Sequence, residues 1–232
     1  MTRSVALALL AVAVTGCVAA REPTRAARAT APAPRPAEMS AEEALARLRA
    51  GNARFREGHL EHPDQGAVRM HQLEREQHPF AVVLSCSDSR VPPEIVFDEG
   101  LGDLFVVREA GHVAGAPTLG SIEYAVEHLG VHLVVVLGHD QCGAVTATVA
   151  ALAHEREPEG HILSLVDLIA PALADVPATG PDAVPRAVRA NVDAVVATLR
   201  ASHPILAHHL EDGSLEVVGG VYDLHTGAIE WR

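Results

Sequence analysis

The chain has 232 residues, 48% of them hydrophobic, which is enough for one α/β domain with appendages. All 18 basic residues are arginine, which excludes a P-loop lysine, a Schiff-base lysine and a Ser–Lys nucleophile pair. Outside the first 38 residues, 13 basic side chains face 28 acidic ones, and this net charge of −15 argues against a nucleic-acid partner.

The N-terminus predicts an export signal over residues 1–17. One arginine precedes an apolar run from Ser4 to Thr15, far shorter than the ~20 residues of a membrane span. The following VTGC resembles a bacterial lipobox, which would make Cys17 the lipidated first residue of the mature protein; plain cleavage after CVAA is the alternative. Residues 18–38, rich in Ala, Pro and Arg, predict a flexible tether. We therefore expect a protein that is periplasmic or anchored to a membrane only through its lipid.

The remainder, residues 39–232, is expected to form a single catalytic domain that begins with a helical arm. In SAEEALARLRAGNARF, Ser40 and Glu43 stand at capping-box spacing, and Gly51 is expected to end or bend the helix. The arm over residues 39–60 is expected either to pack on its own domain or to clasp a second subunit.

Three apolar runs of strand length follow, each leading into a helix. PFAVVLS (79–85), DLFVVR (103–108) and HLVVVLG (132–138) have the continuous apolar character of buried strands. Helices are expected in PPEIVFDEG, GSIEYAVEHLG and GAVTATVAALAHE, and then where apolar residues recur at Val184, Val188, Val192, Val195 and Leu199. GSLEVVGGVYDLHTGAIEWR predicts a terminal strand or hairpin. This order predicts an α/β fold whose mainly parallel central sheet is flanked by helices.

Two cysteines and a histidine follow predicted strands, at the edge where parallel sheets place ligands. Cys86 follows the first strand, and His139 and Cys142 follow the third. A disulfide, a reactive thiol beside His139 and a metal site are all compatible with these residue types, and Cys, His and Cys are ligands that Zn²⁺ prefers. Asp88 and Arg90 favour the metal site, because a catalytic zinc needs an acceptor that orients its water and a group that holds this acceptor. An ordinary surface ion pair is the alternative for those two.

The motifs CSDSR and GHDQCG together resemble the C-x-D-x-R and H-x-x-C-G signatures of β-class carbonic anhydrases, and the similarity extends from LRAGNARF to YDLHTGAIEW. The resemblance implies reversible hydration of CO₂ to bicarbonate and a proton through a zinc-bound hydroxide. In that family the residues matching Cys86, His139 and Cys142 bind one Zn²⁺ per chain, and those matching Asp88 and Arg90 form the catalytic dyad. In some relatives the aspartate becomes a fourth zinc ligand, which closes the site.

Further positions match the plant-type subgroup of that family. By resemblance, Gln77, Phe105 and Tyr124 line the CO₂ pocket, which in the family lies at a dimer interface, and the Gly143 amide helps to bind substrate. The resemblance therefore implies a homodimer or a higher homo-oligomer. Taken alone, the two aromatic residues would be explained by core packing and Gln77 by the polarity of a loop.

One segment departs from the family. After the second strand the chain reads REAGH, so that Glu109 and His112 place titratable groups where neutral amides are usual. We expect them to affect the pH profile and not the metal. Two rival functions stay open on the sequence: a hydrolase of COS or CS₂ on the same scaffold, and a non-enzymatic domain whose cysteines form a disulfide or a structural metal clip.

Overall fold

The computed structural model describes residues 39–232. The predicted export signal, the tether and Cys17 lie outside these described residues. Among the helices described, none has the length and apolar character needed to cross a membrane.

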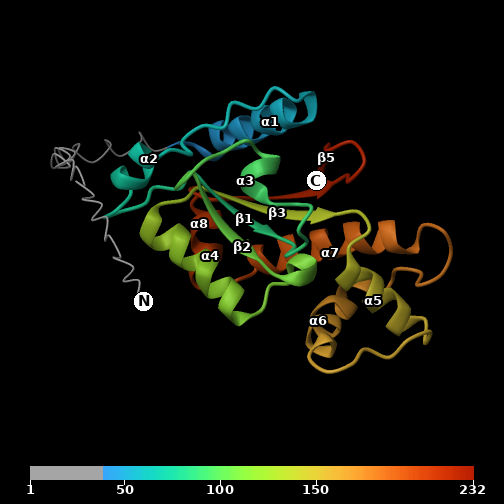
Figure 1. Cartoon of the computed structure of the whole chain (residues 1–232). Coiled ribbons are helices and arrows are strands. Elements are labelled where there is room, and N and C mark those ends of the chain that lie inside the picture. Colours follow the sequence, from blue (N-terminus) through green and yellow to red (C-terminus); the bar gives the residue numbers. More distant parts are fainter. Residues whose placement is uncertain (1–38) are drawn as a thin grey trace, which may run out of the picture. The chain divides into compact units, whose positions relative to one another are not determined.

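A five-stranded sheet forms the centre of the described part (Figure 1). Its strands stand in the order β2-β1-β3-β4-β5; β1 to β4 run parallel and β5 runs antiparallel to β4. Their bounds are β1 Ala81–Ser85, β2 Leu104–Arg108, β3 Leu133–His139, β4 Glu216–Tyr222 and β5 Ile229–Trp231. The predicted α/β class and the C-terminal hairpin are confirmed.

Helices cover both faces of the sheet (Figure 1). Successive strand residues point to opposite faces, so β1 contributes Val82 and Leu84 to one core, with α4, α5, α7 and α8, and Val83 to the other, with α1 and α3. The helices are α1 Ala41–Glu57, α2 Ala67–Gln72, α3 Pro93–Val96, α4 Ala116–Leu129, α5 Gly143–Leu152, α6 Ile162–Ile169, α7 Ala183–Arg200 and α8 Ile205–Glu211, with short 3-10 turns η1 Ala110–His112 and η2 Ala170–Leu173.

Strand β2 differs from the expectation of a buried strand. Every one of its five residues is partly exposed, whereas β1 and β3 are buried along their whole length. The reason is topological, because β2 pairs only with β1 and forms the open edge of the sheet.

Helix α1 begins where the capping box predicts, but it does not end at Gly51. The capping box is present, with the Ser40 side chain accepting a hydrogen bond from the Glu43 amide. The helix continues through Gly51 to Glu57, because Gly51 serves close packing: a Cβ there would lie 1.8 Å from the carbonyl oxygen of Phe97. Leu48 is fully buried against the sheet of its own chain, so α1 packs on its own domain.

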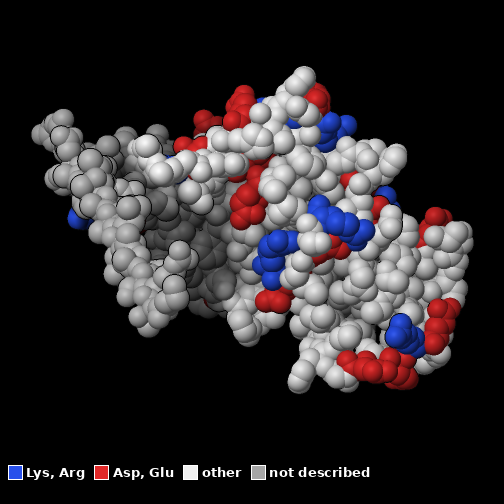
Figure 2. Space-filling view, viewed as in Figure 1, with Lys and Arg blue, Asp and Glu red and all other residues white. Residues whose placement is uncertain are grey.

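The face shown in Figure 2 carries scattered acidic and basic side chains, with acidic groups gathered at the end formed by α5 and α6. No broad basic area is visible on this face of the described residues. This distribution agrees with the excess of acidic residues in the sequence.

Candidate metal centre and active site

The predicted metal ligands converge at the carboxyl ends of two adjacent strands. Cys86 directly follows β1, and His139 is the last residue of β3. Cys142 is the N-cap residue of α5, so the tight turn between β3 and α5 brings it back beside His139. The ligand atoms of the three residues all lie within 4.8 Å of one another, and all three side chains are buried.

The geometry fits a metal ion and not a disulfide. The two sulfur atoms lie 4.0 Å apart, about twice the length of an S–S bond and close to the roughly 3.8 Å separation of two thiolates on a tetrahedral zinc. The Nδ1 atom of His139 donates to the Asp140 carbonyl oxygen at 2.8 Å, which leaves the lone pair on Nε2. Nε2 is buried and has no hydrogen-bond partner in the described structure, as expected for an atom reserved for a metal.

The two thiols behave electrostatically as a coupled pair. The hydrogen bond with Cys142 is the main cause that lowers the pKa of Cys86, and His139 and the Gly111 amide add to it. The pKa of Cys142 is raised, first by the same hydrogen bond and then by burial. One thiolate therefore forms readily and the second does not, because two negative charges 4.0 Å apart repel each other. A divalent cation bound between the two thiolates would offset this repulsion between their negative charges.

Asp88 and Arg90 form a defined pair beside these ligands. The guanidinium of Arg90 donates from Nε to Oδ1 at 2.9 Å and from Nη2 to Oδ2 at 2.7 Å. This bidentate contact holds the pKa of Asp88 well below its usual range, against the opposing effect of burial. Oδ2 of Asp88 lies 3.8 Å from Nε2 of His139, so the ionised carboxylate faces the metal centre.

Arg108 supports the same loop and was not identified as a site residue from the sequence. Its Nε donates to the Cys86 carbonyl oxygen at 3.0 Å, and its Nη2 donates to the Asp88 carbonyl oxygen at 2.6 Å. A signal was available: an arginine ends an otherwise apolar strand, and parallel pairing places it opposite Ser85, next to the ligand.

The two unusual residues of the REAGH segment have different environments. Glu109 is exposed. His112 is fully buried, and burial lowers its pKa to about 4, so the ring is neutral at neutral pH. The ring accepts a hydrogen bond from Asn191 of α7 at 2.9 Å, a contact that the sequence did not indicate. His112 therefore adds no positive charge beneath the metal centre.

The predicted pocket residues do not join the metal centre of their own chain. Gln77 is exposed and precedes β1, whereas Cys86 follows it, so the whole five-residue strand, roughly 16 Å long, lies between them. Phe105 pairs with Val82 near the start of β1. Tyr124 lies with its ring centroid 6.5 Å from that of Phe105 and is 49% exposed, which core packing does not explain.

Gly143 lies beside the metal ligands. It is the first residue of α5, directly after Cys142, and it is exposed. Nothing lies within 4 Å of a Cβ built at this position, so there is space for a ligand next to its amide. The N-terminus of a helix also favours negative charge.

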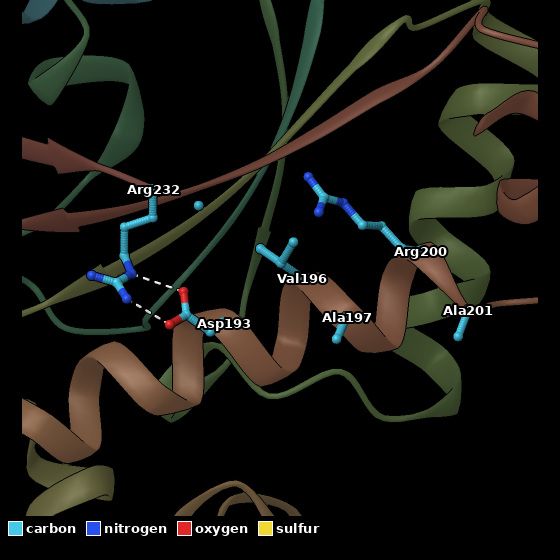
Figure 3. A pocket seen from close by; sticks show the side chains of 7 residues that line it. Asp193, Val196, Ala197, Arg200, Ala201 and Arg232 are labelled. Atoms are coloured by element: carbon cyan, nitrogen blue, oxygen red, sulfur yellow. Dashed lines mark hydrogen bonds and ion pairs between the residues drawn. The ribbon is translucent and has the colours of Figure 1, made fainter. Parts of the chain in front are cut away.

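A cavity of about 480 Å³ elsewhere carries none of this chemistry. It lies between α7 and the end of β5, and Figure 3 shows that Arg232 is already paired with Asp193 there, at 2.8 Å. Arg200, on the same wall, donates to the Val217 carbonyl oxygen at 2.7 Å. Both guanidiniums are thus engaged, and neither a thiol nor an imidazole lines the cavity.

Comparisons with known proteins identify the family and agree with the fold. The family model described as carbonic anhydrase matches residues 81–229. A carbonic anhydrase of Mycolicibacterium smegmatis is 45% identical over 185 residues, which cover 80% of this chain and 90% of that protein. A carbonic anhydrase of Pseudomonas aeruginosa is 38% identical over 166 residues, covering 68% of this chain and 75% of that protein.

Solved structures show the same architecture. The β-carbonic anhydrase CafA of Aspergillus fumigatus superimposes with a TM-score of 0.63 at 28% identity, over 82% of this chain and 89% of that chain. A β-carbonic anhydrase of Sordaria macrospora, described as tetrameric, gives a TM-score of 0.61 at 26% identity, over 67% of this chain and 81% of that one.

The fold is a mainly parallel α/β sheet, and at its carboxyl edge it carries a Cys/His/Cys group that could hold a metal ion. The chain belongs to the carbonic anhydrase family, in its β class. Its reaction is the hydration of CO₂.

Proposed function

We propose that the chain is a zinc-dependent carbonic anhydrase in which Cys86, His139 and Cys142 hold one Zn²⁺. The observation that carries this proposal is the 4.0 Å separation of two thiols beside an imidazole nitrogen that is buried and unpartnered. Bound there, zinc would supply a Lewis acid that activates water at near-neutral pH for attack on CO₂. Two thiolates neutralise more of its charge than imidazoles would, so we expect activity to rise above neutrality rather than below it.

The remaining residues of the site orient the reaction. The ionised Asp88 carboxylate accepts a hydrogen bond from the O–H of the attacking oxygen, which orients the lone pair of that oxygen toward CO₂. Arg90 keeps Asp88 ionised and fixes its orientation through the bidentate contact. Because both Asp88 oxygens are engaged by Arg90, the arrangement supports an open site, in which Asp88 is not a metal ligand. The Gly143 amide at the start of α5 binds the bicarbonate product.

The test is zinc content and CO₂ hydration measured on the same purified protein. We expect close to one zinc per chain, lost together with activity on chelation and regained when zinc is restored. Oxidation of Cys86 and Cys142 to each other, without zinc, would contradict the proposal. Faster hydrolysis of COS or CS₂ than hydration of CO₂ would reassign the substrate.

A second subunit completes the CO₂ pocket in this proposal. Phe105 of the edge strand β2 and Tyr124 of α4 form a partly exposed aromatic pair, and the register places Phe105 opposite Val82, near the start of β1 and not at Cys86. Gln77 is exposed at the same end of the sheet. A homodimer formed along this edge would carry these side chains to the metal centre of the partner. The family resemblance implies the same arrangement, and the Sordaria macrospora relative is described as tetrameric.

Complementation between two inactive variants tests the shared pocket. Cys86→Ser removes the metal centre, whereas Gln77→Ala combined with Phe105→Ala removes pocket residues. If the pocket crosses subunits, each co-refolded heterodimer has one intact site, formed by the metal centre of one variant and the pocket residues of the other. We then expect activity well above that of either parent. If each pocket served its own chain, the mixture would show only the average of the parents.

On the sequence of its first 38 residues, we also propose that the enzyme is exported and lipidated on Cys17, with residues 18–38 as the tether of a single catalytic domain. It would then act in the periplasm or on a membrane. Mass spectrometry of the mature N-terminus tests this proposal, with Cys17→Ser as the control. An unmodified N-terminus directly after CVAA would agree with export and would contradict lipidation.

A further inference from the structure

A buried asparagine of α7 reaches the turn that supports one of the proposed metal ligands. Asn191 is 1% exposed, and its Nδ2 amide donates to the Gly111 carbonyl oxygen and to Nε2 of His112, both at 2.9 Å. Both acceptors belong to η1, the turn that follows β2. Asn191 is thus bonded twice to the same short turn.

That turn has a backbone conformation that needs support. Gly111 has φ 72° and His112 has φ 45°, so two consecutive residues lie in the left-handed region. A side chain other than hydrogen at Gly111 would come within 2.8 Å of Ile169, which leaves the turn little room to move. A non-glycine residue such as His112 rarely adopts this conformation without outside contacts.

The turn aims one backbone amide at a sulfur atom. The Gly111 N–H donates to Sγ of Cys86 at 3.3 Å, in a buried environment. An N–H bond to a thiolate stabilises the negative charge on sulfur and fixes its position.

We propose that Asn191 is a positioning residue of the metal centre: it holds the η1 turn so that the Gly111 amide donates to the Cys86 sulfur, and it thereby strengthens metal binding. This inference rests on the proposed metal site. Through the η1 turn, α7 would control the position of the Cys86 sulfur, although α7 contributes none of the proposed metal ligands.

A purely structural role for Asn191 is the alternative, and the chain offers a matched control. Asn52 of α1 is also buried, at 6% exposure, and its Nδ2 also donates to two acceptors, the Val96 and Gly227 carbonyl oxygens at 3.2 and 2.9 Å. These contacts lie outside the metal centre. Asn52→Leu and Asn191→Leu therefore remove the same kind of bonds from different places.

The experiment is Co²⁺ titration of the wild type and both variants, following the thiolate-to-cobalt charge-transfer band. For Asn191→Leu we expect Co²⁺ binding about 10- to 100-fold weaker, the usual effect of losing an outer contact to a ligand. We also expect the band at longer wavelength, because a thiolate without its N–H donor gives up charge more easily. Asn52→Leu should lower the thermal midpoint of unfolding and leave the affinity and the band unchanged.

Unchanged affinity and band in Asn191→Leu, with only a lower thermal midpoint as in Asn52→Leu, would overturn the proposal. If Asn191→Leu does not fold, Asn191→Ser is the milder variant, and wild-type affinity and band in that variant would overturn it equally. A wild type that binds no Co²⁺ would remove the proposed metal site and this inference together. If the wild type binds Co²⁺ and Asn191→Leu shows the same affinity and band, the metal site stands and this inference alone is wrong.

Discussion

The two ends of strand β1 have opposite characters. At its carboxyl end, Cys86 lies in a buried centre where the groups are held by backbone and arginine contacts within one chain. Beyond its amino end, Gln77 is exposed, and the aromatic pair of Phe105 and Tyr124 lies on the neighbouring open edge. The first region is complete in a single chain, and the second becomes functional, in our proposal, only against another copy. In our proposal, the groups that need exact atomic positions lie within one chain, and the apolar surface for substrate is completed at an interface.

Within the buried region around Cys86, the substitution with the largest expected effect on activity is Cys142→Ser. Because the side chain is buried and is one of the three proposed ligands, we expect zinc content to fall to near zero and CO₂ hydration to fall by at least about 1,000-fold. Zinc analysis and stopped-flow hydration assays check this. Zinc retained at one per chain with full activity would mean that the thiol is not a ligand.

Asp88→Asn should separate catalysis from metal binding within the same region. The amide keeps the shape of the side chain and loses its role as a charged acceptor, so kcat/KM should fall roughly 10²- to 10⁴-fold while zinc content stays unchanged. Asp193→Asn is the control and should leave the rate unchanged, because this carboxylate pairs with Arg232 in a cavity that contains neither thiol nor imidazole. Zinc loss in Asp88→Asn would instead indicate that Asp88 is a ligand in a closed site.

The exposed region should respond more mildly. Phe105→Ala removes one apolar wall of the proposed pocket, and we expect kcat/KM to fall about tenfold with metal content intact. Val106→Ala, on the opposite face of the same edge strand, is the matched control. Sedimentation velocity shows whether either variant also weakens the oligomer. Equal activity losses in the two variants would assign the effect to the strand and not to the pocket.

The difference between the regions also explains what the sequence could predict. The metal ligands and Asp88 follow strands that apolar runs predict, and parallel strands end at one edge, so their convergence could be inferred. Arg108 is visible as a charged residue that ends an apolar strand, but its place beside Cys86 depends on the register of β2 against β1. Asn191 lies on α7, far along the chain from the turn that it holds, and nothing in its neighbourhood marks it.

Three short helices were not listed among the helices expected from the sequence, for a related reason. α2, α6 and α8 have six, eight and seven residues, too few for a helical apolar period to stand out. Gly51 was misjudged because a glycine that allows close packing has the same sequence signature as one that ends a helix. Exposure was misjudged at β2, where an apolar run forms an edge strand. An apolar edge is the expected sign of a surface that meets another chain.

The last predicted effect concerns stability and not activity, at the buried His112 near the complete region. Burial lowers the pKa of His112 to about 4 from its ordinary value of 6.5, so between these pH values the unfolded chain takes up a proton that the native state does not bind. The free energy of unfolding should therefore fall as the pH falls from 6.5 towards 4, by about 3 kcal/mol from this group. His112→Asn removes the titrating group and suits the left-handed backbone, so its denaturant midpoint should fall less over the same range. Measuring zinc-loaded and chelated protein separates this effect from acid release of the metal. If wild type and variant differ in pH dependence only when zinc is bound, the effect belongs to the metal. If they differ in the zinc-loaded and in the chelated protein, the effect belongs to the imidazole ring.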